Sequence, residues 1–364
     1  LAIVQSASAM RTAVANYVKL TGFEKEGVKL KAALVTDTLT GKSFLIRAKL
    51  FINCTGAFAD QVRHMANPTL PRRMRPSKGV HVILPFNTLK SKDAMLIPKT
   101  SDGRVVFAIP FEGQLLVGTT DTEYKPVEKE PVLDDKEADF LLDTLRPYLK
   151  TQPLRSEIKA GFGGLRPLLA ADPTKSTKGL TRDHEVEHDE ASNLISLLGG
   201  KWTTYRLMAK DTIDLVDTLL NQTNPCLTAD HLLAGSENFA YEDWKKIQQH
   251  TSLQEDTCQH LLLKYGSRAH QLGQLMQEDA SLADRLIHEY PYIKAEVVYT
   301  VQHEMAVVPR DFLARRIRLE ITDWEATLQC LPMVCELMGK ELGWDLPTRQ
   351  KRQEEYQNEI LAFK

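Results

Sequence analysis

The residues of this sequence best suited to chemistry lie in the run Gly-Gly-Lys-Trp-Thr-Thr-Tyr-Arg that begins at Gly199. A short apolar stretch precedes Gly199 and Gly200, and an amphipathic pattern follows Lys201, which predicts a strand, a turn and a helix start. The first N–H groups of a helix lack intrahelical acceptors and the dipole is positive there, so this turn is suited to binding an anion. A glycine-rich turn with an exposed lysine fits the same spacing. A P-loop does not, because that motif needs Gly at position 195 and Ser or Thr at 202, where this chain has Ile195 and Trp202.

A second candidate is Arg166, in the run Gly-Phe-Gly-Gly-Leu-Arg-Pro-Leu that begins at Gly161. The glycines allow a ligand or another backbone to approach closely, and Pro167 stiffens the chain after the arginine. An arginine in this setting is suited to bidentate binding of a phosphate or a carboxylate. A surface turn with Arg166 in an ion pair is the alternative that this motif leaves open.

A histidine and a polar strand end mark two further predicted strands. His81 stands in the apolar run Lys-Gly-Val-His-Val-Ile-Leu, and another strand ends in Gly-Thr-Thr-Asp-Thr-Glu-Tyr, which finishes at Tyr124. Imidazole titrates near neutral pH and can therefore move protons. A lone histidine in an apolar strand is more often a core residue with satisfied hydrogen bonds. A catalytic role for His81 depends on neighbours that the sequence does not identify.

Two charged runs predict surface structure rather than binding sites. His184 and His188 lie in Asp-His-Glu-Val-Glu-His-Asp-Glu, which we interpret as a solvated hairpin, and we expect no metal site. A basic cluster without interleaved aromatic residues consists of Arg72, Arg73, Arg75 and Lys78, in a chain whose formal net charge is −2. Nucleic-acid partners favour a strongly basic face, so we expect no nucleic-acid partner.

Strands that end near one another are needed to bring these candidates together. Turn signals at Glu26–Gly27 and Thr40–Gly41 predict short strands between residues 16 and 54. The last of them is expected at 48–54 and leads into Thr55 and Gly56, and a strand, a glycine turn and a helix are how a doubly wound sheet meets a nucleotide. Apolar patterns and turn signals next predict an antiparallel set of strands at 77–84, 95–97, 104–110 and 114–119. We then expect a helix at 134–149, strands near 157–161, 180–188 and 194–198, and a helix at 203–220.

The sequence beyond Pro225 changes to helical periodicity and predicts a separate helical domain. A capping box at Ser252–Glu255 and a C-terminal glycine cap at Gly266 are expected within it. The predicted helices lie near 239–249, 252–264, 268–278, 293–306, 310–321, 323–341 and 347–361.

Length and composition describe an ordinary globular protein with room for two or three domains, since 43% of its 364 residues are hydrophobic and 26% are charged. Its 5 cysteines are scattered and never spaced as CxxC, which argues against a disulfide framework and favours a reducing, cytosol-facing compartment. No apolar run approaches the roughly 20 residues that span a bilayer, and peripheral membrane contact stays open. Because the chain begins with Leu1 and enters an amphipathic pattern directly, we expect a piece of a longer protein.

Six short motifs occur together in one order, and their combination is far more specific than any one of them. In this order and spacing the chain resembles the FAD-dependent glycerol-3-phosphate dehydrogenases. The helical tail resembles that family's C-terminal domain, for example in Tyr-Gly-Ser-Arg at 265–268, so the resemblance covers essentially the whole chain. The six motifs are Asn-Cys-Thr-Gly-Ala at 53–57, Lys-Gly-Val-His at 78–81, Gly-Thr-Thr-Asp at 118–121, Gly-Leu-Arg-Pro at 164–167, Thr-Arg-Asp at 181–183 and Gly-Gly-Lys-Trp-Thr-Thr-Tyr-Arg at 199–206.

The resemblance implies a mixed α/β (α+β) fold with three parts. Residues 1–61 and 171–225 would form a partial, doubly wound FAD-binding domain. Residues 62–170 would form an antiparallel-sheet substrate or cap domain, and residues 226–364 an all-helical C-terminal domain. The family's GxGxxG and the acidic residue after it are absent from the sequence. We therefore expect a truncated part of the enzyme, inactive by itself, that binds FAD weakly or not at all.

The resemblance also implies roles for the candidate residues. Arg166 and Lys201 would hold the substrate, with Lys201 near its phosphate and Arg166 near the reacting hydroxyl, and Tyr124 would border the pocket. His81 would be the base that removes the hydroxyl proton, and Arg166 would assist catalysis. The residues expected to contact FAD are Thr55, Gly56, Gly164, Gly199, Gly200, Lys201, Trp202 and Thr203.

The implied reaction is the oxidation of sn-glycerol 3-phosphate to dihydroxyacetone phosphate, with hydride transfer to FAD. A quinone is the expected electron acceptor, because the sequence has no long insertion of the kind expected in the oxidase branch. Further expectations are a homodimer and a cytoplasmic location, peripheral on the inner face of the cell membrane. Two other functions stay open: another FAD-dependent amine or 2-hydroxy-acid oxidoreductase of the same fold, and a noncatalytic helical interaction module.

Overall fold

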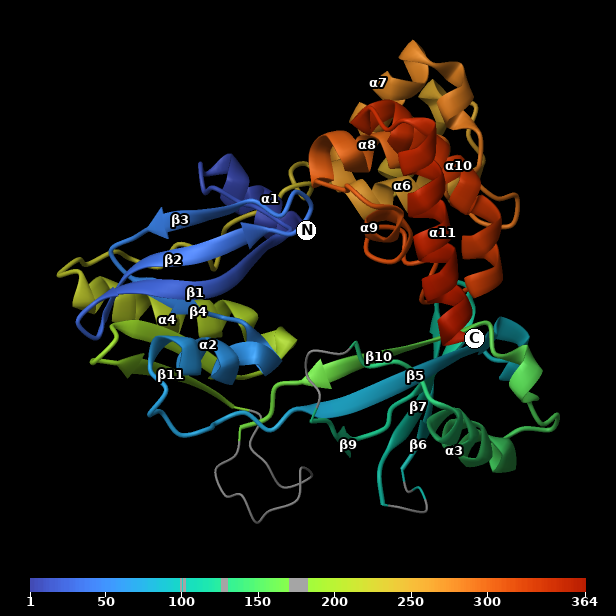
Figure 1. Cartoon of the computed structure of the whole chain (residues 1–364). Coiled ribbons are helices and arrows are strands. Elements are labelled where there is room, and N and C mark those ends of the chain that lie inside the picture. The colour runs from blue at the N-terminus through green and yellow to red at the C-terminus, as the bar shows by residue number, and fades with distance from the viewer. Residues whose placement is uncertain (99, 101–102, 126–129, 170–182) are drawn as a thin grey trace.

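The computed structural model of the chain describes residues 1–98, 100, 103–125, 130–169 and 183–364. Within them lie three β-sheets and a helical region, which Figure 1 shows in orange and red. Leu180, Thr181 and Arg182, which belong to a predicted strand and to one motif, lie outside the described residues. None of the described helices combines the length and the apolar composition needed to cross a membrane. The helices before residue 226 are α1 (Ala2–Ala9), α2 (Ala59–Ala66), α3 (Asp135–Leu145) and α4 (Tyr205–Leu219).

The first sheet is an antiparallel meander. Its strands β1 (Val18–Glu26), β2 (Lys29–Asp37) and β3 (Ser43–Arg47) are neighbours in both sequence and space. The two connecting turns contain Gly27 and Gly41, whose φ angles of 62° and 74° suit glycine. The turn signals in the sequence therefore correctly placed both connections.

The second sheet is small and mixed. Its central strand β12 (Leu194–Gly199) pairs parallel with β4 (Phe51–Asn53) and antiparallel with β11 (His184–Asp189). Helix α2 lies against β12, and Val62 of α2 shares a buried core with Leu194. The parallel β4–β12 pair brings the turn after β4 and the turn after β12 to the same edge of the sheet, because parallel strands share their carboxyl ends.

The third sheet is antiparallel and has the strand order β10-β5-β8-β7-β6, with β9 paired to β5. Alternate residues of β5, such as Val80 and Val82, pack against Leu141 and Leu145 of α3. Helix α3 ends at Leu145 rather than at 149, and a 3-10 turn over Arg146–Tyr148 follows it, because Pro147 has no N–H to donate to the α-helical hydrogen-bond ladder. The strands are β5 (Ser77–Pro85), β6 (Met95–Ile97), β7 (Val106–Phe111), β8 (Gln114–Gly118), β9 (Thr122–Glu123) and β10 (Ala160–Arg166).

Strand β10 differs from its prediction. The strand expected near 157–161 is wrong in position, because Arg155–Glu157 forms a 3-10 turn and the strand begins at Ala160. Its whole glycine-rich run pairs antiparallel with β5, from Ala160 opposite Ile83 to Arg166 opposite Ser77. Arg166 therefore ends a strand, and the alternative of a surface turn does not hold.

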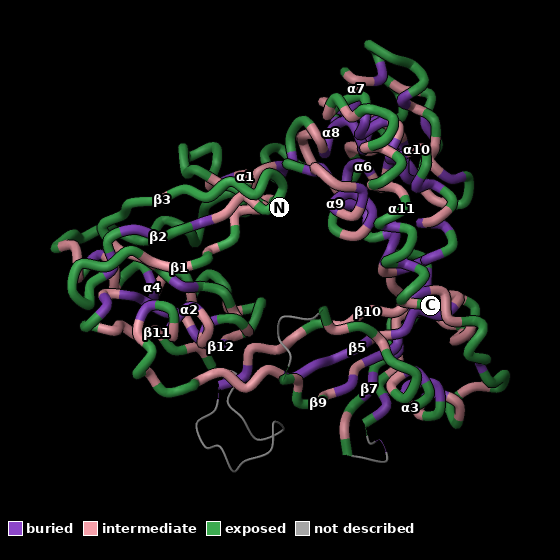
Figure 2. The backbone as a smooth tube through the Cα atoms, in the orientation of Figure 1, coloured by how far each residue is buried: buried purple, intermediate pink, exposed green. Residues whose placement is uncertain are grey.

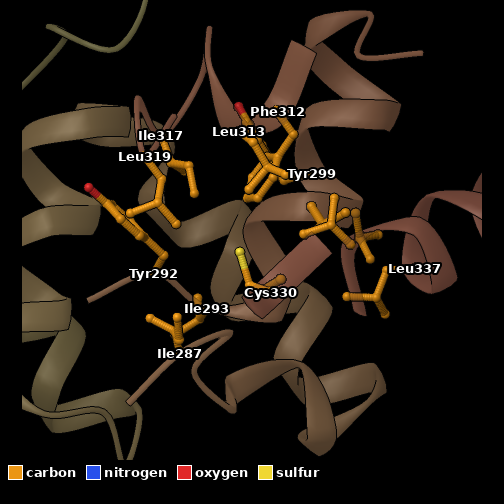
Figure 3. Close-up of a cluster of buried hydrophobic side chains, with 14 of the residues drawn as sticks. Ile287, Tyr292, Ile293, Tyr299, Phe312, Leu313, Ile317, Leu319, Cys330 and Leu337 are labelled. Carbon is orange, nitrogen blue, oxygen red and sulfur yellow. The ribbon is translucent and has the colours of Figure 1, made fainter. Parts of the chain in front are cut away.

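The C-terminal region is helical, as predicted, and its largest fully buried side chains include Tyr299 and Phe312 (Figure 3). Gly266 ends its helix with a φ of 59°, as expected. The predicted capping box at Ser252 is wrong, because the N-cap of that helix is Gln254, whose side chain makes no capping hydrogen bond. The helices are α5 (Trp244–His250), α6 (Glu255–Tyr265), α7 (Ala269–Glu278), α8 (Lys294–Glu304), α9 (Pro309–Leu313), α10 (Trp324–Leu342) and α11 (Leu346–Phe363).

Helix α9 is shorter than the predicted helix at 310–321. It ends at Leu313, and Arg318 a little further on has a positive φ of 61°, which a right-handed helix does not accommodate. The helical core also includes Ile83 of β5 and Ala160 of β10, so the helices pack directly on the antiparallel sheet. In Figure 2 the buried, purple stretches of the helical region and of β5 mark these two packed layers.

Candidate active site

The imidazole of His81 lies on the face of the antiparallel sheet opposite to α3, because alternate residues of β5 point to opposite faces. In the register of the sheet, His81 has Gly118 of β8 on one side and Phe162 of β10 on the other. The rings of His81 and Phe162 are stacked, with centroids 5.0 Å apart. A Cβ atom on Gly118 would stand 2.2 Å from Cδ2 of His81, so only glycine leaves room for this ring.

Arg166 extends over the same face from the end of β10. Its Nη2 donates a hydrogen bond of 3.0 Å to Oγ1 of Thr119, and its Nη1 lies 3.9 Å from the carboxylate of Asp121. A Cβ atom on Gly79 would stand 2.3 Å from Nη2 of Arg166, so this glycine too makes room for a charged side chain. Gly164, opposite Gly79 in the register, has no atom near the position of a Cβ and leaves open space beside the guanidinium.

The environment of His81 keeps its imidazole neutral. Burial, and to a smaller extent the positive charge of Arg166, together lower the pKa of His81 from 6.5 to about 4. Its Nδ1 is buried and accepts or donates no hydrogen bond among the described residues. The ring is therefore a neutral group with a free nitrogen beside a cation at neutral pH, which is the state that can accept a proton.

The Gly-Gly-Lys turn has the backbone that the sequence predicts. Gly199 and Gly200 have φ angles of 70° and 86°, and Lys201 precedes the 3-10 turn that opens α4. A Cβ atom on Gly199 would stand 2.7 Å from the carbonyl oxygen of Asp183. Lys201 and Thr203 are exposed, and Trp202 is 77% exposed, with its ring stacked on a neighbouring tyrosine of α4. The turn thus offers backbone N–H groups and a lysine to an external group.

Thr55 and Gly56 form the corresponding turn after β4. Asn53 is buried and accepts hydrogen bonds from the backbone N–H and the hydroxyl of Thr55, at 3.2 and 2.6 Å. Gly56 has a φ of 58° and starts a 3-10 turn that contacts both β12 and β10. This turn is therefore the element that joins the mixed sheet to the strand that carries Arg166.

Tyr124 lines a pocket that does not include His81 or Arg166. This pocket has a volume of about 510 Å³ and is also lined by Asp60, His64, Arg72 and Arg75. The backbone N–H of Tyr124 bonds to the carbonyl of Pro76, so the residue follows directly after the short pairing of β9 with β5. The structure therefore places Tyr124 next to the strand that carries His81 but in a separate pocket.

The two charged runs have local partners. The run around His184 and His188 forms the predicted hairpin of β11 and β12, and the two rings bond to Asp211 and Asn193 at 2.8 and 2.9 Å. Arg73 of the basic cluster forms ion pairs with glutamates of β11, and Arg75 pairs with Glu123 of β9. The described residues contain no group of three or more His, Cys, Asp or Glu placed to hold a metal.

Two family models match this chain. The model described as FAD dependent oxidoreductase matches residues 1–215, and the model described as C-terminal domain of alpha-glycerophosphate oxidase matches residues 226–349. The first alone covers more than half of the 364 residues. The chain belongs to the FAD-dependent oxidoreductase family. FAD is the cofactor of this family.

Curated relatives of this FAD-dependent oxidoreductase are similar to nearly all of it. The probable mitochondrial glycerol-3-phosphate dehydrogenase of Dictyostelium discoideum is 36% identical over 340 residues, which are 91% of this chain and 52% of that protein. The mitochondrial glycerol-3-phosphate dehydrogenase of Homo sapiens is 35% identical over 367 residues, which are 97% of this chain and 50% of that protein. The chain thus spans about half the length of the curated relatives it matches.

A solved structure supports the same family. The glycerol-3-phosphate dehydrogenase from Bacillus halodurans, solved in complex with FAD, superposes on this oxidoreductase with a TM-score of 0.85 at 28% identity. The superposition covers 99% of this chain and 71% of that protein. This match confirms the predicted fold class, a mixed α/β fold with an antiparallel sheet and a helical C-terminal region.

Thr119, Asp121 and Phe162 of this oxidoreductase belong to the candidate site but were not predicted from the sequence. Their motifs were visible, since Thr119 and Asp121 belong to the polar strand end and Phe162 to the glycine-rich run. Their importance follows from the sheet order, which places β10 and β8 on the two sides of β5. Ser77 of β5 also bonds to Asp121, so that Asp121 lies between a serine and the guanidinium of Arg166.

Proposed function

We propose that this oxidoreductase, within the complete protein, oxidises sn-glycerol 3-phosphate to dihydroxyacetone phosphate. The observation that carries the proposal is that the neutral imidazole of His81 and the guanidinium of Arg166 lie on the same face of the sheet. A proton acceptor beside an anion-binding cation suits a substrate that has both a hydroxyl to oxidise and a negative charge to hold. The names of the similar curated proteins supply the identity of that substrate.

The residues that we propose to hold FAD fit a flavin in chemical terms. When bound, FAD supplies the acceptor for the two electrons and the hydrogen that leave C2 of the substrate. Gly199 and Gly200 have no side chain to obstruct close approach, and the N–H groups of Trp202 and Thr203 stand at a helix start with positive dipole. Thr55, Gly56, Gly164 and Lys201 complete the proposed cofactor contacts. All of these contacts except Gly164 lie in the proposed FAD-binding part, residues 1–61 and 171–225. Gly164 belongs to the proposed substrate part, residues 62–170, and residues 226–364 form the proposed helical part.

His81 is the proposed base. A pKa of about 4 leaves its ring neutral at pH 7, and the ring can then take the proton of the substrate hydroxyl. A bound substrate, with its phosphate at Lys201, would add negative charge to the site and so act against the positive charge of Arg166, which is one of the two causes of the low pKa. Substrate binding would therefore raise the pKa of His81 and make the ring a stronger base at the moment when it is needed.

Arg166 and Lys201 are the proposed substrate cations. Arg166 is fixed by Thr119 and would orient the oxygen atoms near the reacting carbon, while the exposed Lys201 would neutralise the phosphate. We also propose that Tyr124 borders the substrate site, because it directly follows β9. A quinone acceptor, a homodimer and a peripheral membrane location remain part of the proposal through the family resemblance alone.

The experiment that tests the function is an anaerobic titration of the FAD-loaded full-length protein with sn-glycerol 3-phosphate, followed by flavin absorbance. We expect bleaching by this substrate and none by glycerol or by amino acids, because both lack the phosphate that the proposed site binds. Bleaching by an amine or a 2-hydroxy acid in its place would move the assignment to another oxidoreductase of this fold. A loaded protein that no such substrate reduces would favour the noncatalytic interaction module. Reoxidation by a soluble quinone but not by oxygen would support the quinone as acceptor.

A further inference from the structure

Arg310, at the start of α9, connects the helical region to the segment that precedes α3. Its guanidinium forms two hydrogen bonds of 2.7 Å with the two carboxylate oxygens of Glu130. The same guanidinium bonds to Glu320, whose carboxylate also accepts a hydrogen bond of 2.6 Å from the hydroxyl of Tyr356 in α11. Arg310 is 15% exposed and Glu320 is 6% exposed, so the helical end of this cluster is firmly buried.

The segment that follows Glu130 lies directly on β10. A Cβ atom on Gly163 would stand 2.4 Å from the carbonyl oxygen of Pro131, and one on Gly161 would stand 2.4 Å from Cδ2 of Leu133. These two glycines point to the face of β10 that carries no catalytic side chain, since Phe162 and Arg166 point to the other face. Glycine at both positions thus allows residues 130–133 to press against the back of the strand.

The helical region contacts β10 in two other ways. The backbone N–H of Trp324 donates to the carbonyl of Lys159, and Nζ of Lys159 forms an ion pair of 2.9 Å with Asp323, both just before the strand begins. Phe162, which stacks on His81, packs against the helical core from the catalytic face. Figure 1 shows α9 and α11 above β5 and β10, with the C-terminus beside these strands. The helical region therefore contacts β10 at its start and on the face that carries Phe162 and Arg166. Through Glu130 it also holds the segment on the opposite face.

We propose that Arg310 is a positioning residue of the active site: by binding Glu130 it holds residues 130–133 against β10 and so fixes the strand that carries Phe162 and Arg166. The inference deepens the proposed function, because it gives the C-terminal helical region a role in placing the residues that act on the substrate. Arg310 itself lies away from the substrate and acts through Glu130 and the strand.

The test compares Glu130→Ala with the matched control Glu359→Ala in the full-length protein. Both glutamates lie near the guanidinium of Arg310, at 2.7 and 3.7 Å, and their side chains are 55% and 51% exposed. Only Glu130 belongs to the segment on β10, since Glu359 is on α11. Either change removes one negative charge from the same arginine and leaves its bonds to Glu320 in place.

Amide hydrogen exchange of residues 160–166 is the first measurement. Glu130→Ala should speed exchange in this strand by about tenfold, and Glu359→Ala should leave it as in the wild type. The second measurement is the KM for sn-glycerol 3-phosphate, which should rise by about fivefold to tenfold only in Glu130→Ala, with kcat and the thermal midpoint nearly unchanged.

Wild-type exchange in Glu130→Ala, or equal acceleration in both variants, would overturn the inference. If the proposed function were wrong, sn-glycerol 3-phosphate would not reduce the flavin of the protein. The hydrogen-exchange result would still decide whether Arg310 holds β10. An unaltered KM together with accelerated exchange would restrict Arg310 to holding the strand and reject its role in placing Arg166.

Discussion

Gly118 on β8 lies directly opposite His81 on β5, and a Cβ atom on Gly118 would stand 2.2 Å from Cδ2 of the imidazole. Gly79, whose partner in the register is Gly164, likewise leaves room for Arg166, because Nη2 of Arg166 would lie 2.3 Å from a Cβ atom on Gly79. Because they have no Cβ atom, Gly118 and Gly79 leave space for the two ionisable side chains of the candidate site. The four residues come from three neighbouring strands of one sheet.

Replacement of Gly118 by alanine should disturb the site more than the fold. The added methyl group would displace the ring of His81 from Phe162, and we expect the rate of flavin reduction by substrate to fall by about 10- to 100-fold. Gly22→Ala is the control, because it also adds a methyl group to a strand glycine but meets no atom within 4 Å. Stopped-flow absorbance measures both rates, and an unchanged rate in Gly118→Ala would show that the ring position does not matter.

The variant His81→Gln tests the base directly. Glutamine keeps a polar side chain of similar reach but cannot accept the proton of the substrate hydroxyl, so turnover should fall by roughly 10²- to 10⁴-fold. Binding of the phosphate should weaken much less, because His81 is not one of the proposed cations. Steady-state kinetics and the affinity for a non-oxidisable phosphate separate the two effects. Unchanged turnover would remove His81 from the mechanism.

Stability should depend on pH through His81. The folded protein holds the pKa of His81 at about 4, chiefly by burial and then by the charge of Arg166, whereas the unfolded chain has the ordinary value of 6.5. Between these values the unfolded state binds the extra proton, so the free energy of unfolding falls as pH is lowered, by on the order of 3 kcal/mol in total. Urea midpoints at pH 7 and pH 4.5 should therefore separate less in His81→Gln than in the wild type. Equal separation in both proteins would argue that the low pKa is not real.

Lys201→Met should weaken substrate binding without affecting the fold. Lys201 is exposed, and its proposed role is to neutralise the phosphate, so the KM for sn-glycerol 3-phosphate should rise by about tenfold. The control is Lys210→Met, which removes a half-buried lysine of α4 that forms an ion pair with Asp214 at 2.5 Å. Equal KM values for the two variants would contradict a special role for Lys201.

Gly199→Ala should lower the affinity for FAD beyond its cost in stability. A φ of 70° and the carbonyl of Asp183 at 2.7 Å from a Cβ atom make alanine strained here, by about 1–3 kcal/mol. Gly41→Ala imposes the same backbone strain at a φ of 74° in the β2–β3 turn, with no atom nearby. Thermal unfolding should show a loss in both, while flavin fluorescence should show weaker FAD binding only in Gly199→Ala. Equal FAD affinity would place the cofactor elsewhere.

Local signals predicted much of the fold. The glycines at 27 and 41 and the turn at Gly113 have positive φ, as their turn signals require, and the strands and helices follow the periodicity of the apolar residues. The errors lie where a distant contact decides a local boundary. Strand β10 was placed too early, because its extent is set by pairing with β5 rather than by its own glycine-rich sequence.

The candidate site shows the same division. The motifs by themselves identified His81, Arg166 and the Gly199–Gly200 turn, because a histidine, an arginine among glycines and a helix start carry their chemistry in a few adjacent residues. Only the tertiary structure paired His81 with Gly118 and Phe162, lowered its pKa and linked Arg310 to the back of β10. The sequence determines what a side chain can do and what its neighbours along the chain prefer. Which groups face one another depends on strand order, register and burial, and these are set by the packing of the whole molecule.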